Sequence, residues 1–107
     1  MSNIFAIIEI GSNNTKTHIY KNEETIYEKT TTIEFKKNYK NENKVNEEDL
    51  NKLYKVIENA LSYTKDVNIY GCSIFRNISI EELNEINEKI YNKFGLKLQV
   101  VSREDES

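Results

Sequence analysis

The stretch IFAIIEI-GSNN-TKTHIY, residues 4–20, decides the fold because it contains two short strands joined by a tight turn. Ile4–Ile10 is a β-branched run, which favours a strand. It stops at Gly11–Asn14, where glycine and asparagine tolerate the positive φ angles that turns use. Thr15–Tyr20 then alternates apolar and polar side chains, as a return strand does. The chain is therefore predicted to open with a β-hairpin.

Further strands and two helices are predicted after this hairpin. Asn46 is a good helix N-cap, Ser79 and Glu82 have capping-box spacing, and Gly95 stands where a helix C-cap belongs. We expect strands over 25–35, 67–71 and 96–101, helices over 46–65 and 79–95, and a mobile loop over 36–44. This order, β-β-β-α-β-α-β, predicts an α/β fold: one five-stranded mixed sheet with helices packed on it.

Three segments are predicted to meet at one edge of this sheet. Gly11–Asn14, Ser73–Arg76 and Ser102–Glu106 follow the first, fourth and fifth strands, which we expect to be parallel. Open α/β sheets bind ligands at the carboxyl ends of such strands. We therefore expect the functional site at this edge.

Composition excludes several classes of protein. The 107 residues have room for one domain, and 31% of them are charged, with a net charge of -3. Without a basic excess, neither DNA nor a membrane surface is an expected partner. The single cysteine, Cys72, and the absence of a signal peptide predict a cytoplasmic protein.

The hairpin turn is the first candidate site. Successive amides of Gly11–Asn14, with the side chains of Ser12, Asn13 and Thr15, can form an anion-binding nest. Glu9 is a carboxylate set among isoleucines, and burying it would require a partner such as a metal or another cation. An ordinary turn with Glu9 on an open face explains the same residues, and taken alone they favour that simpler interpretation.

Two further candidates follow the fourth and fifth strands. The guanidinium of Arg76 presents a fork of donors that suits phosphate oxygens. The carboxylates of Glu104–Glu106 can raise one another's pKa, so that one of them serves as a general base. In isolation, a surface arginine paired with a helix carboxylate and a solvated acidic tail are the favoured interpretations.

Together these segments resemble the N-terminal domain of the exopolyphosphatase/guanosine pentaphosphate phosphatase family, a branch of the actin-like ATPase superfamily. Glu9–Asn14 stands in place of the family's Asp-x-Gly-Ser-Asn-Ser pattern. Cys72–Arg76 matches Thr-Ser-Ala-x-Arg at its serine and arginine, and Ser102–Ser107 occupies the position of Ser-Gly-x-Glu-Glu-Ala. Three motifs in register favour the phosphate-binding interpretation over the simpler ones.

The resemblance implies a ribonuclease H-like fold and a phosphohydrolase that removes terminal phosphate from polyphosphate or guanosine pentaphosphate. Residues 1–107 would be its single N-terminal lobe, and the second lobe would be absent. The isolated lobe would be inactive. A homodimer is one assembly that the resemblance leaves open. The implied roles are a first phosphate loop at Gly11, Ser12 and Asn13, a Mg²⁺ contact at Glu9, a substrate-phosphate contact at Arg76 and activation of the attacking water at Glu106.

The sequence also departs from the family pattern. Glu9 is one methylene longer than the usual aspartate, which would move or abolish the metal contact. Further departures are Asn14 for a hydroxyl residue, Ile74 for a small residue, Ile80 for an asparagine and Arg103 for a glycine. A non-catalytic phosphate- or nucleotide-binding module, or a lobe of an actin-like small-molecule kinase, are the alternatives. Arg76 and the acidic end favour the phosphatase branch.

Overall fold

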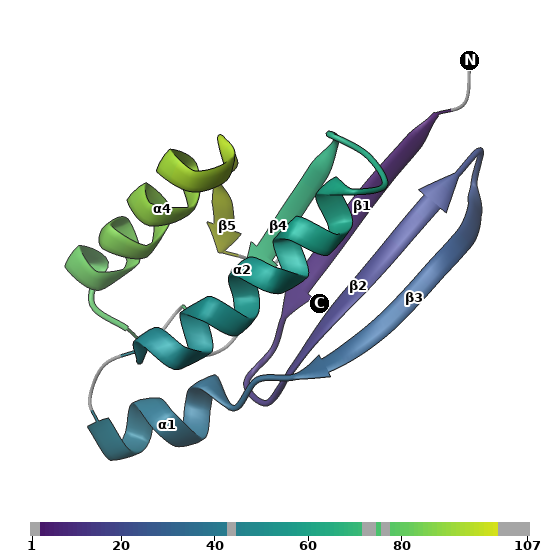
Figure 1. The fold of residues 1–107 in the computed structure, drawn as a ribbon. Helices are drawn as coiled ribbons and strands as arrows, with labels where there is room; N and C mark the ends of the chain where they lie inside the picture. Colours follow the sequence, from purple (N-terminus) through teal and green to yellow (C-terminus); the bar gives the residue numbers. More distant parts are fainter. Residues whose placement is uncertain (1–2, 43–44, 72–74, 76–77, 101–107) are drawn as a thin grey trace.

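Strand β1 (Ile4–Ile10) lies in the middle of a five-stranded sheet with the order β3-β2-β1-β4-β5 (Figure 1). The computed structural model describes residues 3–42, 45–71, 75 and 78–100. The other strands are β2 (Asn14–Lys21), β3 (Glu24–Thr32), β4 (Val67–Gly71) and β5 (Leu98–Val100). β1 pairs antiparallel with β2 and parallel with β4, and β4 pairs parallel with β5. The mixed sheet confirms the predicted fold class.

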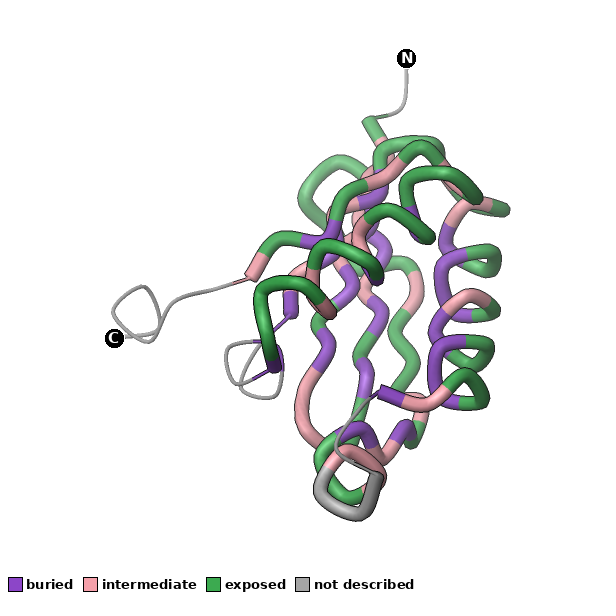
Figure 2. Tube along the Cα trace, turned by 90° about the vertical axis from the view of Figure 1, so that its left-hand side faces the viewer, coloured by how far each residue is buried: buried purple, intermediate pink, exposed green. Residues whose placement is uncertain are grey.

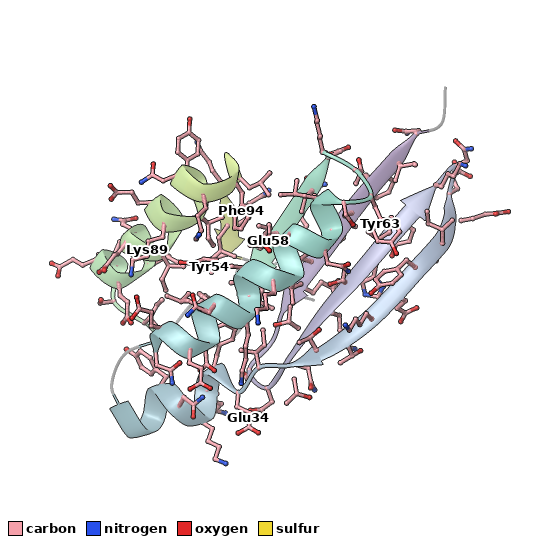
Figure 3. The ribbon with its side chains drawn as sticks, in the orientation of Figure 1. Glu34, Tyr54, Glu58, Tyr63, Lys89 and Phe94 are labelled. Atoms are coloured by element: carbon pink, nitrogen blue, oxygen red, sulfur yellow. The ribbon has the colours of Figure 1, made fainter. Side chains whose placement is uncertain are left out.

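Two long helices, α2 (Glu47–Leu61) and α4 (Ile80–Phe94), cover one face of this sheet (Figure 1). The buried residues of α2 lie on its side toward the sheet, and the exposed residues lie on the other side (Figure 2). Tyr54 of α2 and Phe94 of α4 contact each other, with ring centroids 6.0 Å apart (Figure 3). Burial raises the pKa of Tyr54 above its ordinary value. None of the helices in the described ranges is long and apolar enough to cross a membrane.

The starts of both long helices confirm the predicted caps. The side chain of Asn46 accepts a hydrogen bond from the Asp49 N–H at 2.7 Å, and Ser79 accepts one from the Glu82 N–H at 3.1 Å. The Glu82 carboxylate accepts a bond from the Val45 N–H at 2.6 Å instead of closing a capping box on Ser79. This bond joins the start of α4 to the segment before α2, so the two helices begin side by side.

The core lies between the helices and the inner face of the sheet. Along β1, Ala6, Ile8 and Ile10 are fully buried, while Ile7 is half-buried and Glu9 is exposed. This alternation follows from the two-residue period of a strand that is covered on one face. The hydrophobic residues of α2 and α4 complete the core from the other side.

One predicted loop is a helix. The third strand was expected to run to residue 35 and a mobile loop to fill residues 36–44, but β3 ends at Thr32 and α1 (Phe35–Glu42) follows. The reason is that α1 is strongly polar and carries only Phe35 and Tyr39 on its apolar side. One such pair, four residues apart, is too short a pattern to indicate a helix from sequence. The observed order is therefore β-β-β-α-α-β-α-β.

Candidate functional site

The strands β1, β4 and β5 end side by side at one edge of the sheet. Ile10 is the register partner of Gly71, and Gly71 is the partner of Val100. Neighbouring strands lie about 4.8 Å apart, so the segments that leave these three residues start close together. This confirms the predicted parallel arrangement of the three strands. Of the residues expected beyond them, the turn at 11–14 is described, whereas Arg76 and Glu106 lie outside the described residues.

Gly11 lies at a close approach of the backbone in the turn. Its N–H donates to the carbonyl oxygen of Asn14 at 2.8 Å, and a Cβ atom on Gly11 would lie 3.1 Å from that same oxygen. We expected glycine here for a positive φ angle, which is wrong. Among the described residues, positive φ occurs only at Asn22, Glu23 and Gly95. The turn is tight because its two ends meet, not because its backbone is left-handed.

Helix α1 holds the turn from behind. The Ile33 N–H donates to the carbonyl of Asn13 at 3.2 Å, and the Lys36 N–H donates to the carbonyl of Ser12 at 3.0 Å. Both donors belong to the connection that enters α1 or to its first turn. The carbonyl oxygens of Ser12 and Asn13 are thus directed toward α1, which fixes the backbone conformation of the turn. This role was not predicted from the sequence, because α1 was not predicted.

An aromatic pair packs helix α1 against Phe75, which follows β4 in the sequence. The rings of Phe35 in α1 and Phe75 pack edge to face with centroids 5.5 Å apart, and each side chain is 1% exposed. Arg76 follows Phe75 directly in the sequence. Phe75, the residue before the predicted phosphate-binding arginine, therefore packs on the same helix that holds the hairpin turn.

Four predicted site residues line one surface hollow of about 370 Å³: Glu9, Gly11, Ser12 and Asn13. Glu9 is exposed there, as in the simpler of the two interpretations, so burial does not require it to have a cationic partner. Its register partner on β2 is Lys16, which lines the same hollow. Lys16 was not singled out from sequence, although the hairpin register places it opposite Glu9 on the same face. An ammonium group beside the turn adds a contact for an anion.

A larger hollow, of about 620 Å³, lies between the first turns of α2 and α4. The acidic residues Glu47, Glu81, Glu82 and Glu85 line it, and their charge disfavours a phosphate ligand. In the described part of the chain, no three His, Cys, Asp or Glu residues are grouped so that they can hold a metal ion. This hollow is therefore not the site that the sequence predicts.

Substitution of Gly71 by alanine tests the packing at this edge. The added Cβ would lie 2.9 Å from Cδ2 of Phe75 and 3.3 Å from Cδ1 of Leu98, so the ring must shift. We expect Gly71→Ala to lower the free energy of unfolding by about 1–3 kcal/mol through overpacking, as measured by urea denaturation. Gly71→Ala combined with Phe75→Leu should show a smaller loss than the sum of the two single changes, because leucine leaves room for the methyl group. Additive losses would contradict this account.

Several solved structures of Ppx/GppA and exopolyphosphatase proteins have the same fold as this chain. The Aquifex aeolicus member of the Ppx/GppA family is 17% identical, with a TM-score of 0.79 over 99% of this chain. The Aquifex aeolicus PPX-GPPA enzyme is 19% identical, with a TM-score of 0.79 over 100% of the chain. An exopolyphosphatase from Cytophaga hutchinsonii is 15% identical, with a TM-score of 0.74 over 92%. No protein-family model and no curated protein sequence matches the chain.

The match covers only part of each of these proteins. This chain spans 37%, 38% and 34% of the three structures, in the order given above. At identities below 20%, the likeness shows a common fold and does not extend to the chemistry of the sites. The resemblance inferred from the three sequence motifs is confirmed at the level of the fold: the chain has the fold of about one third of a Ppx/GppA phosphatase.

Proposed function

We propose that this chain forms the phosphate-loop lobe of a phosphohydrolase that removes terminal phosphate from polyphosphate or guanosine pentaphosphate. The observation that supports the proposal best is the fixed turn at Gly11–Asn14, which lies at the edge where β1, β4 and β5 end. Open α/β sheets bind ligands at such an edge. In this proposal the protein is cytoplasmic, and a second lobe completes the site.

Each candidate residue has one role in this proposal. The backbone amides and side chains of Ser12 and Asn13 bind a substrate phosphate, next to Gly11, whose own N–H is bonded to Asn14. Arg76 binds other oxygens of the same phosphate through its guanidinium. Glu106 takes the proton of the attacking water, which adds in line to the terminal phosphorus as the bond to the bridging oxygen breaks. Lys16, opposite Glu9 in the hollow, adds positive charge on the side of the turn.

Glu9 is the residue that can hold a divalent cation in this arrangement. Its carboxylate is exposed and lines the hollow beside the turn, so it is accessible to an ion bound there. Mg²⁺ is commonly held by one or two carboxylates together with phosphate oxygens and water. Glu9 would therefore share Mg²⁺ with the bound phosphate, and the ion would offset negative charge on the phosphoryl group.

A phosphate-release assay tests this function on the natural protein that contains this chain. We expect release from polyphosphate or guanosine pentaphosphate, and a loss of about 10²–10⁴-fold in kcat for Glu106→Gln, because the general base is removed. Glu104→Gln, in the same acidic segment, is the matched control and should retain most of the activity. Residues 1–107 alone should release no phosphate, because half of the proposed cleft is missing.

Three results would overturn parts of the proposal. An unchanged rate for Glu106→Gln would remove this residue as the base. Binding of phosphate without release from either substrate would identify a non-catalytic binding module. Transfer of phosphate to a small acceptor in preference to water would identify a kinase of the actin-like superfamily.

A further inference from the structure

A second pocket, of about 220 Å³, lies between α2 and the strands β2 and β3. It lies on the sheet face that α2 covers, next to the edge strand β3. Lys29 of β3 and Lys52 and Lys55 of α2 line it, together with the hydroxyl residues Thr17 and Thr31. The pocket shares no lining residue with the hollow at the hairpin turn, so it is a separate site.

The three lysines are not held in ion pairs within the described part of the chain. None of them forms an ion pair or a hydrogen bond with a described residue. Lys52 and Lys55 are neighbours on one face of α2, and Lys29 faces them from β3. Like charges that converge on one pocket repel each other, and a bound anion relieves this repulsion. The charge of the pocket is thus complementary to an anion and opposite in sign to the net charge of the chain, which is -3.

The pocket is also lined by a buried hydroxyl residue, Thr17. The side chain of Thr17 is 2% exposed and makes no hydrogen bond to a described residue. Thr15, which precedes it on the same face of β2 but does not line the pocket, is 0% exposed, and its Oγ1 atom has no partner in the described structure. The Thr17 hydroxyl is therefore the buried donor that lines the pocket. Hydroxyl donors beneath ammonium groups suit the oxygens of an oxyanion.

We propose that this pocket binds a small phosphate-type oxyanion, either inorganic or as the phosphate group of a small metabolite. The ammonium groups of Lys29, Lys52 and Lys55 contact its outer oxygens, and the Thr17 hydroxyl donates from below. The volume corresponds to roughly seven water molecules at about 30 Å³ each, which is room for one or two phosphate groups. The negative net charge of the chain further disfavours nucleic acid as the occupant.

The test is an NMR titration of the 107-residue chain with inorganic pyrophosphate at constant ionic strength, following backbone amides. We expect saturable shifts at Thr17, Lys29 and Thr31, separate from any shifts at residues 11–14. The double variant Lys52→Gln/Lys55→Gln should raise the Kd at these amides at least about tenfold, because two charge-assisted contacts are removed. Orthophosphate, titrated in parallel, distinguishes a site for one phosphate from a site for two.

Matched controls separate the pocket from general attraction of anions. Lys65→Gln/Lys97→Gln removes the same charge from exposed lysines elsewhere on the chain and should leave the Kd within about twofold. Thr17→Val, which keeps the shape of the side chain, should weaken binding without changing net charge. An equal loss of affinity in the two double variants, or shifts confined to residues 11–14, would overturn the proposal. Binding at residues 11–14 is measured in the same spectra, so failure of either site is seen independently.

Discussion

Substitution of Phe75 by alanine will lower the free energy of unfolding by about 3–5 kcal/mol, the range for removing a buried aromatic ring. Phe75 is 1% exposed and packs edge to face on Phe35, so alanine would leave a cavity between α1 and the end of β4. Aromatic pairs of this geometry contribute about 0.5–1.5 kcal/mol beyond their buried area. Urea denaturation monitored by circular dichroism measures the loss.

The conservative change Phe75→Leu is the control for this prediction. Leucine fills most of the same space, so at least half of the lost stability should return. Phe94→Ala, at a half-buried ring between α2 and α4, should have a smaller effect than Phe75→Ala. A loss of less than about 1 kcal/mol for Phe75→Ala would show that this ring does not anchor the segment after β4.

The second large effect is expected in the central strand. Ile8 is fully buried beneath the helices, and Ile8→Ala should lower the free energy of unfolding by about 2–5 kcal/mol. Its neighbour Ile7 has the same side chain but points to the opposite face of the sheet, where it is half-buried. Ile7→Ala is therefore a matched control, and it should lower stability by less than half as much.

These two alanine variants also test the one-sided covering of the sheet. Successive residues of a strand face opposite sides of the sheet. The difference between the two losses of stability therefore reports how much more one side is buried than the other. Equal losses of stability, measured by the same denaturation method, would mean that the face bearing Ile7 is as well packed as the face beneath α2 and α4. That result would contradict the arrangement described above.

The strands could be predicted because their signals are local. The fourth strand was predicted at Val67–Gly71 and is found there, since a short apolar run ends at a glycine. The cap at Gly95 is confirmed by its φ of 73°, which glycine adopts without strain. The second helix ends at Leu61 rather than near Lys65, because the apolar stripe stops there. Helix α1 was missed because its stability comes from tertiary contacts such as Phe35 on Phe75.

The candidate site was predictable only in part. The turn residues and Glu9 line one hollow, as their adjacency in sequence suggested. Glu9 lies on an open face, as the simpler of the two interpretations had it, because an isoleucine-rich strand buries both faces only if both are covered. Arg76 and Glu106 remain predictions, as they lie outside the described residues. Contacts such as Lys36 to Ser12 depend on α1, which sequence patterns do not indicate.

The hydrogen bonds from Ile33 and Lys36 to the turn have a thermodynamic consequence. The carbonyl groups that accept these bonds belong to the turn itself. The conformation of the turn and the docking of α1 therefore change together, as one equilibrium between a docked and an undocked state. A ligand that prefers the docked turn then binds with its intrinsic affinity multiplied by the docked fraction. Sequence changes in α1, far from any phosphate contact, can in this way tune affinity without touching the ligand.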